Sequence, residues 1–252
     1  LKDAGNVATY IPELAHVDPD MFGVNMTTLD GAHFGMGNNL DKFSIQSIAK
    51  VLSLTMAYNI LGEKIWNRID VEPSGTKFDS LLLLETYSGI PRNPFVNSGA
   101  IVVCDILISE LGDARIEFLD YVRDIKNDPA EVLDFYFDMC SLEMNCQQLS
   151  HTFAFLANGG RKLSDEKKII SKSKCKRINA LMLTCGFYDE SGEFAFKVGL
   201  PGKSGVGGGI VALYPGNYSI AVWSPRLNPK GNSFKGMKFL EEVTTHSELS
   251  IF

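Results

Sequence analysis

The sequence predicts an α+β fold: one antiparallel sheet built from the N- and C-terminal segments, flanked by helices and carrying an inserted helical lobe. Strand-like patterns lie near both ends of the 252-residue chain, whereas apolar residues in its middle are spaced three and four apart, as in amphipathic helices. We expect a single unit over residues 1–252, with an α/β lobe at about 1–70 plus 180–252 and a helical lobe at about 71–179. The two parts would leave a cleft between them, where ligands commonly bind.

Two hairpins account for the predicted sheet, over residues 22–29 with 32–36 and over residues 209–214 with 218–223. Asp30-Gly31 is a strong turn signal for the first hairpin, and Pro215-Gly216-Asn217 makes the turn of the second. The second hairpin is apolar enough to be central in the sheet. Shortly before it, Phe194, Phe196 and Val198 occupy alternate positions, which fits a further strand.

The middle of the chain is predicted to be helical. Apolar spacing of three and four predicts helices over residues 48–61, 99–111, 116–125, 129–140, 146–157 and 177–184. No internal repeat and no long linker interrupts this part of the sequence. These helices supply most of the inserted lobe.

Composition limits the classes of function. The net charge is −6, from 24 basic and 30 acidic residues, so the chain has no excess of positive charge for binding a nucleic acid. The basic stretch at residues 167–177 is interrupted by apolar and small residues and fits a solvated face. Five cysteines without a C-x-x-C pair and four scattered histidines show no metal-ligand spacing, so we expect no bound metal.

The same features give an expected location. Reduced thiols are the simplest interpretation of the five cysteines, and they indicate a reducing compartment. No apolar run approaches the roughly 18 residues of a membrane span, and no signal-peptide pattern opens the chain. We therefore expect a cytoplasmic protein that makes no contact with a membrane.

Residues 43–54 carry the most informative chemistry. A serine hydroxyl is a poor nucleophile until a neighbouring base removes its proton, and a lysine whose pKa is lowered by burial can be that base. Residues three apart on a helix share a face, so the Ser47-x-x-Lys50 pattern places the amine beside the hydroxyl. A serine in the first helical turn can also offer its backbone N–H to a developing oxyanion.

The Ser-x-x-Lys pattern alone is a weak signal, because it occurs five times in the sequence, starting at serines 47, 74, 164, 171 and 173. Only Ser47 opens a long apolar helix, in which Lys50 would lose contact with water. The competing interpretation is an ordinary serine at a helix start, with Lys50 extending to solvent.

A second motif, Lys203-Ser204-Gly205, favours the catalytic interpretation. It leads through Val206 and further glycines into the C-terminal hairpin, and those glycines let a substrate approach the backbone closely. Lys-Ser-Gly at the start of a strand is the counterpart of the Lys-Thr-Gly element that lines the cleft of penicillin-recognising serine enzymes. A phosphate-binding loop and a plain glycine-rich bend are the alternatives, although no G-x-x-x-x-G-K-[ST] or G-x-G-x-x-G pattern is present.

Several stretches, in the correct order over nearly the whole chain, resemble the glutaminase family of the serine β-lactamase-like fold. They are residues 9–15, 43–50, 89–100, 134–137, 156–160, 185–189, 199–209, 223–225 and 231–233. The resemblance implies a single catalytic unit that hydrolyses L-glutamine to L-glutamate and ammonia. It also implies that no metal or organic cofactor is needed and that the chain forms a homodimer or homotetramer.

The resemblance implies roles for individual residues. Ser47 is the expected nucleophile and Lys50 its base, and the backbone N–H groups of Ser47 and Val206 are the expected oxyanion hole. Tyr136 is expected to share proton transfer with Lys50, and Tyr188 to lie over the reacting amide as a candidate acid. The expected substrate-binding residues are Tyr10, Gln46, Asn97, Tyr136, Tyr188 and Val206.

Three of these residues have ordinary structural interpretations as well. Tyr10 fits a half-buried aromatic residue, and Tyr136, between two phenylalanines, fits a core residue. Asn97, followed by Ser-Gly, fits a cap for the helix after it.

One stretch departs from the family pattern. Family members carry a longer segment between the helix ending near Arg123 and the helix start at Asp128-Pro129, with a glutamate and an asparagine that bind the amino-acid head of glutamine. Here residues 123–128 run straight through, and no residue takes those roles. The abrupt join within an otherwise intact pattern favours a segment omitted from this sequence, because surface segments near active sites are often mobile. A true deletion would put recognition of the α-amino and α-carboxyl groups in doubt.

Two alternatives stay open from the sequence. A β-lactamase or penicillin-sensitive peptidase on the same scaffold would use the same Ser47, Lys50 and Lys203-Ser204-Gly205 set. A catalytically silent member would act as a binding or assembly module, and a true loss of the substrate-binding segment would favour it.

Overall fold

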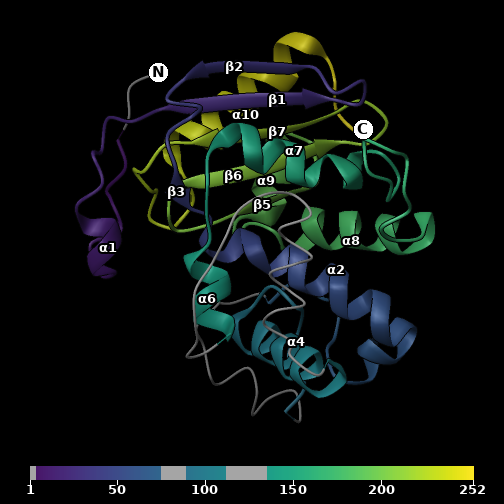
Figure 1. Ribbon diagram of the computed structural model, residues 1–252. Helices are drawn as coiled ribbons and strands as arrows, with labels where there is room; N and C mark the ends of the chain where they lie inside the picture. The colour runs from purple at the N-terminus through teal and green to yellow at the C-terminus, as the bar shows by residue number, and fades with distance from the viewer. Residues whose placement is uncertain (1–3, 75–88, 112–134) are drawn as a thin grey trace.

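A five-stranded antiparallel sheet lies at the centre of the structure (Figure 1). The structure is a computed structural model that describes residues 4–74, 89–111 and 135–252, with only the backbone for residues 135–137. The strands are, in sheet order, β2 (His33–Gly37), β1 (Gly23–Thr28), β7 (Tyr218–Trp223), β6 (Gly209–Tyr214) and β5 (Gly202–Ser204). Both predicted hairpins are confirmed, and pairing of β1 with β7 joins the two ends of the chain in one sheet, as predicted.

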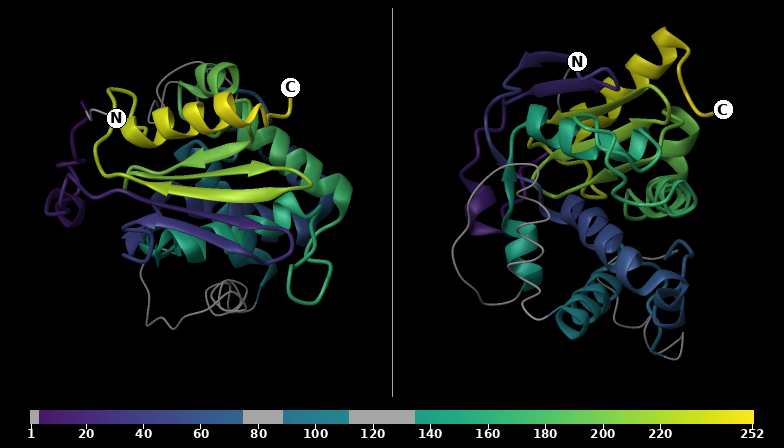
Figure 2. Two further views of the ribbon diagram at one scale, coloured as in Figure 1. Left: turned by 90° about the horizontal axis from the view of Figure 1, so that it is seen from above. Right: turned by 45° about the vertical axis from the view of Figure 1, so that its right-hand side comes forward.

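The sheet is covered on both faces. α7 (Cys146–Ala157) packs against β1, β6 and β7 on one face, where Val211 and Trp223 join the larger apolar cluster. α10 (Phe234–Ser247) lies along the opposite face, over Ile210 and Val222 (Figure 2). Alternate side chains of β6 and β7 therefore enter two different cores, which explains why both strands are apolar throughout.

Most of the other helices lie beside and below the sheet in Figure 1, whereas α9 (Ser191–Lys197) packs on the face that α10 covers, where Phe194 joins Ile210 and Val222. The other helices are α1 (Pro12–Ala15), α2 (Ala49–Leu61), α4 (Asn97–Glu110), α6 (Phe135–Ser141), α8 (Lys172–Cys185) and α9 (Ser191–Lys197). The helices predicted over 48–61, 99–111, 146–157 and 177–184 are confirmed, although the last begins earlier, at Lys172. The helix predicted over 116–125 lies outside the described residues, as does the first part of the one predicted over 129–140. The proposed division into two lobes stays a prediction, and α7 lies on the sheet although its residue numbers fall in the predicted helical lobe.

The strand expected around Phe194 is wrong, because Ser191–Lys197 form the helix α9. Phe194 and Val198 are both buried, whereas Phe196 is 89% exposed. A helix accounts for this pattern, since residues four apart share a face and the residue between them points away. Over five residues, strand alternation and helical spacing cannot be told apart.

The C-terminal helix α10 was not predicted. Its buried residues Gly236, Leu240 and Thr244 are spaced four apart, and Ser233 caps its start by accepting a hydrogen bond from the Gly236 N–H. Both are helix signals. Within the described residues, no helix is long and apolar enough to cross a membrane.

Candidate active site

Ser47 lies in a 3-10 turn, Gln46–Ile48, that runs directly into α2. A two-stranded sheet of β3 (Phe43–Ser44) and β4 (Glu143–Met144) fixes the chain just before this turn. Gln46 has a φ of 48°, a left-handed conformation that is strained for residues other than glycine. The turn buries Ile48 completely while Ser47 lines a cleft, so the local backbone presents the serine to solvent-accessible space.

One cleft of about 1270 Å³ brings together six of the predicted site residues, which come from distant parts of the sequence. They are Tyr10, Gln46, Ser47, Asn97, Tyr188 and Val206. Lys50 lies behind the cleft and contacts Asn97. Tyr136 lies on α6, whose last residues line the cleft, but its side chain is outside the described part of the structure.

Lys50 is buried three residues after Ser47, with only 1% of its surface exposed. Its Nζ donates hydrogen bonds to the backbone oxygen of Phe95 (3.2 Å) and to Oδ1 of Asn97 (2.7 Å). Burial lowers the pKa of Lys50 from 10.5 to about 8, because the charged ammonium loses its hydration. A lysine with this pKa carries a substantial neutral fraction near pH 8 and has the chemistry of a general base.

Asn97 contacts Lys50 and does not cap α4. The N-cap position of α4 is Val96, and no side chain caps the helix. The side chain that binds the backbone N–H groups before the helix is that of Asn93. Its Oδ1 accepts from the N–H groups of Phe95 (2.9 Å) and Val96 (3.1 Å). The amide of Asn97 is thereby available to orient the lysine at the edge of the cleft.

Two glycines bring Val206 against the Ser47 segment. A Cβ at Gly205 would lie 2.5 Å from the Ile45 oxygen, and one at Gly207 would lie 2.3 Å from the Ser44 oxygen. Side chains cannot approach a backbone oxygen so closely, so the loop requires glycine at both positions. The N–H of Val206, between them, donates to no acceptor within the described residues. A donor without a protein acceptor next to a serine is what an oxyanion hole requires.

Lys203 is a second buried amine in this region, also 1% exposed. Its Nζ donates to the backbone oxygen of Ser204 (2.6 Å) and lies 4.8 Å from the centre of the Tyr188 ring. Burial, and then the nearby charge of Lys50, hold the pKa of Lys203 well below its usual value. Two amines in one buried region disfavour each other's charge, so the pair favours neutral amine over ammonium.

Tyr188 completes the group, with its hydroxyl buried and its backbone in the left-handed region at a φ of 54°. The Ser47 and Ser204 side chains interact with this hydroxyl and lower its pKa, but by less than burial raises it. Burial raises the pKa of Tyr188 above its usual 10.0, so the phenol keeps its proton at neutral pH. A protonated phenol beside a serine can serve as an acid.

The remaining predicted residues lie toward the rim. Tyr10 is 69% exposed, and it borders the cleft without joining a core. Gln46 Nε2 donates to the Ser44 hydroxyl (2.9 Å), which in turn donates to the backbone oxygen of Cys140 (2.8 Å). These bonds hold the side chain of Gln46 along the turn that carries Ser47.

Three buried polar residues near Tyr188 are absent from the predicted site residues: Lys203, Asn232 and Glu190. The Lys-Ser-Gly motif was a signal for Lys203, and the family-like residues 231–233 were a signal for Asn232. No local pattern marks Glu190, because its role depends on partners far away in the sequence.

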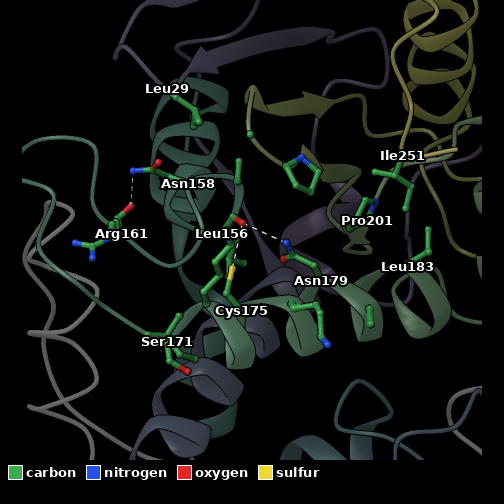
Figure 3. A pocket seen from close by; sticks show the side chains of 18 of the residues that line it. Leu29, Leu156, Asn158, Arg161, Ser171, Cys175, Asn179, Leu183, Pro201 and Ile251 are labelled. Atoms are coloured by element: carbon green, nitrogen blue, oxygen red, sulfur yellow. Dashed lines mark hydrogen bonds between the residues drawn. The ribbon is translucent and has the colours of Figure 1, made fainter.

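A second hollow, of about 920 Å³, lies over α8 and the β6–β7 turn (Figure 3). Apolar side chains such as Leu156, Leu183 and Ile251 line it, and its serine, Ser171, caps α8. This hollow has no lining residue in common with the cleft at Ser47. Among the residues that the structure describes, no group of three His, Cys, Asp or Glu side chains is placed to hold a metal ion.

A serine beside a lysine that burial turns into a base is the arrangement of hydrolases that transfer acyl groups through a serine ester. The antiparallel sheet, covered by helices on both faces, is that of the serine β-lactamase-like fold. Comparison with known proteins narrows this class to one family. The chain belongs to the glutaminase family, whose model matches residues 5–125 and 113–252.

Individual relatives agree with this assignment. The glutaminase of Saccharophagus degradans is 51% identical, over 99% of this chain and 93% of the relative, and that of Christiangramia forsetii is 50% identical, over 98% and 93%. The solved structure of the probable glutaminase ybaS superposes with a TM-score of 0.90 at 30% identity, over 99% of this chain and 93% of the other. A probable glutaminase from Bacillus subtilis, complexed with 6-diazo-5-oxo-L-norleucine, gives a TM-score of 0.85 at 30% identity, over 98% and 91%.

The comparisons also bear on the departure near Arg123. The alignment with the Saccharophagus degradans protein runs over 286 positions, more than the 252 residues of this chain. The two family matches overlap at residues 113–125, next to residues 123–128, where the sequence departs from the family pattern.

Proposed function

We propose that this chain hydrolyses the side-chain amide of L-glutamine to L-glutamate and ammonia through an ester on Ser47. The observation that carries the proposal is the pairing of Ser47, open to the cleft, with Lys50, buried three residues later and bonded to Asn97. Family membership and the relatives named glutaminase supply the substrate. The ligand of the Bacillus subtilis structure supports it, since 6-diazo-5-oxo-L-norleucine is an L-amino acid with a carbonyl at carbon 5, where glutamine has its amide.

In the first step, the Ser47 oxygen forms a bond to the amide carbon while its proton passes to the neutral amine of Lys50. The electron pair of the C=O double bond moves to the oxygen, and the N–H groups of Ser47 and Val206 bind that oxyanion. Tyr188 then gives its proton to the leaving nitrogen as the C–N bond breaks, and ammonia departs. Tyr136 is proposed to share proton transfer with Lys50.

In the second step, water attacks the glutamyl ester on Ser47. One proton of the water returns the phenol of Tyr188 to its neutral form, and the proton held by Lys50 returns to the Ser47 oxygen as the ester bond breaks. The product leaves with a side-chain carboxylic acid, which gives its proton to the solvent to become glutamate, and every protein group is restored. The same oxyanion hole serves both steps, because both pass through a tetrahedral carbon.

We assign substrate binding to residues that surround the cleft around Ser47: Tyr10, Gln46, Asn97, Tyr136, Tyr188 and Val206. None of them offers a carboxylate for the α-amino group of glutamine. That role falls to the segment expected near Asp124–Asn127, and an intact-mass measurement of the native protein decides whether the segment exists. A mass that matches the present sequence would mean a true deletion and would favour a silent binding module.

The experiment that tests the proposal measures ammonia and glutamate release from L-glutamine by the native protein, beside a Ser47→Ala variant and a chromogenic β-lactam. We expect glutamine turnover that disappears in the variant, with the β-lactam left intact. Turnover of the β-lactam alone would favour the penicillin-recognising alternative. No turnover of either compound by folded protein of full family length would favour the silent module.

Assembly and location are proposals of the same kind. We propose a homodimer or homotetramer, which light scattering at several protein concentrations would test. We also propose a cytoplasmic location without metal or organic cofactor. The five cysteines, all free, fit a reducing compartment.

A further inference from the structure

A buried chain of hydrogen bonds lies behind Tyr188. The Ser204 hydroxyl donates to Oδ1 of Asn232 (2.5 Å), and Nδ2 of Asn232 donates to Oε2 of Glu190 (2.6 Å). Ser204 and Asn232 are completely buried, and Glu190 is 8% exposed. Asn228 donates to the same carboxylate oxygen (2.8 Å). Buried polar groups are costly unless they are hydrogen-bonded, and Ser204, Asn232 and Glu190 each have a hydrogen-bond partner.

Glu190 determines which group donates and which accepts in each of these hydrogen bonds. A carboxylate can only accept hydrogen bonds, so Asn232 must turn its Nδ2 toward Glu190 and its Oδ1 toward Ser204. Ser204 has one hydroxyl hydrogen and gives it to Asn232. The oxygen of Ser204 is therefore left as an acceptor toward the Tyr188 hydroxyl. Ser204 and Asn232 also hold the backbone just before Tyr188, because the Ser204 N–H donates to the Gly186 oxygen (3.2 Å) and Nδ2 of Asn232 donates to the Phe187 oxygen (3.4 Å).

The residues that make these hydrogen bonds come from three separate segments of the sequence. Tyr188 and Glu190 lie in the connection between α8 and α9, Ser204 ends β5, and Asn232 follows β7. Asn228 organises that last loop, because its Oδ1 accepts from the N–H groups of Lys230 and Asn232 (both 3.0 Å). These hydrogen bonds thus tie the left-handed backbone at Tyr188 to strand β5 and to the loop after β7.

We propose that Glu190, Asn232 and Ser204 are positioning residues for Tyr188. They present an oriented acceptor to its hydroxyl and hold the residue beside Ser47, where its proton reaches the leaving nitrogen. The inference rests on the proposed role of Tyr188 as the acid.

A double-mutant cycle between Ser204 and Tyr188 tests the proposal. We expect Tyr188→Phe to lower kcat about 100-fold and Ser204→Ala about tenfold, with KM for L-glutamine changed less than kcat. In the Tyr188→Phe background, Ser204→Ala should have almost no further effect on kcat, because its role acts through the missing hydroxyl. Ser219→Ala is the matched control: Ser219 is also a buried sheet serine, and its Oγ has no hydrogen-bond partner within the described structure.

A polarity exchange tests the carboxylate. Asn232→Asp places two carboxylates face to face and should lower kcat about 100-fold. Adding Glu190→Gln to that variant supplies an amide donor opposite the new carboxylate, so kcat should recover to within about tenfold of the wild type. Glu190→Gln alone keeps an accepting oxygen and should cost less than Asn232→Asp. Circular dichroism of each variant gives the folded fraction to which kcat is referred.

The outcomes separate this inference from the proposed function. If the native protein does not release glutamate, or if Tyr188→Phe turns over like the wild type, the proposed function or its acid fails. If Tyr188→Phe is impaired but Ser204→Ala lowers kcat equally in both backgrounds, or the double variant at 190 and 232 stays as slow as Asn232→Asp, the positioning role is wrong while the glutaminase assignment stands.

Discussion

Two of the five Ser-x-x-Lys segments of this protein, at Ser47 and Ser171, differ in the contacts of both the serine and the lysine. Ser47 lines a cleft, and the Lys50 that follows it is 1% exposed and has a pKa lowered to about 8 by burial. Ser171 instead caps α8 by accepting from the backbone N–H of Lys174 (3.3 Å). The amine of Lys174 donates to the backbone oxygen of Tyr58 (2.8 Å) near the surface.

The difference shows that the surroundings of a helix decide what the pattern does. The first turns of α2 are buried on every side, from Ala49 to Thr55, so any amine there loses its water. α8 buries only one stripe, and its lysines reach solvent or backbone oxygens at its rim. The cleft at Ser47 also holds two of the non-glycine residues with left-handed backbone, Gln46 and Tyr188. The hollow lined by Ser171 is of comparable size but lacks buried amines (Figure 3).

The two serines give the largest expected contrast. Ser47→Ala should lower kcat by at least about 10⁴-fold, because the bond-forming atom is removed. Ser171→Ala should leave kcat within about twofold and lower the free energy of unfolding by about 1 kcal/mol, because only a helix cap is lost. Glutamate release and urea denaturation measure the two effects. An active Ser47→Ala protein would contradict the account.

The two lysines should differ almost as much. Lys50→Met should lower kcat by about 10³-fold through loss of the base, whereas Lys174→Met should keep near-normal turnover. The folded pKa of Lys50, about 8, is lower than the 10.5 of an unperturbed lysine, so the unfolded state binds this proton more tightly. The cost to stability of up to about 3 kcal/mol is present below pH 8 and is relieved as pH rises toward 10.5.

Denaturation at several pH values checks that sign. Lys50→Met should be more stable than the wild type at pH 7, and the gap should narrow as the pH rises. A gap that stays constant from pH 7 to pH 10 would mean that Lys50 carries no shifted pKa in the folded protein.

The next largest effect on kcat is expected from substitution of a glycine beside Val206. Gly205→Ala should lower kcat by about 100-fold, because a Cβ 2.5 Å from the Ile45 oxygen pushes the Val206 N–H away from Ser47. Gly192→Ala in α9 is the matched control, since a Cβ there meets nothing within 4 Å. It should leave kcat unchanged and slightly favour the helix. Equal kcat in both variants would remove Val206 from the proposed oxyanion hole.

The pH dependence is the smallest of these effects. If neutral Lys50 is the base, kcat/KM for L-glutamine should rise about tenfold per pH unit up to pH 8 and then level off. Lys174→Met should show the same profile as the wild type. A profile that is flat between pH 6 and pH 8 would contradict Lys50 as the titrating base.

The sequence predicted the sheet well because its evidence is local. The Asp30-Gly31 turn and the apolar run at Gly209–Tyr214 specify their own structure, and the observed strands agree. Around Phe194 the local pattern fits either a strand or a helix. The structure has the helix, and the Phe194 ring stacks on the Phe187 ring with 3.7 Å between the ring centres. The proposed nucleophile and base also lie within one short segment, so the sequence alone was enough to propose them.

What the sequence could not give is long-range. Glu190 acquires its place only from Asn232, and Asn97 was ambiguous until Lys50 could be seen to donate to it. The apolar helix around Lys50 predicted that its amine would be buried, but the two acceptors of that amine, the Phe95 oxygen and Oδ1 of Asn97, come from a distant segment. Such roles depend on contacts between residues that lie far apart in the sequence.

Ser47 is proposed to be the nucleophile that attacks the substrate carbonyl. Incubation with 6-diazo-5-oxo-L-norleucine, followed by peptide mapping by mass spectrometry, tests it most directly. We predict one adduct per chain on the peptide that contains Ser47, formed in parallel with loss of turnover, absent in Ser47→Ala and unchanged in Ser171→Ala. Loss of turnover with the adduct on any other residue would contradict the account.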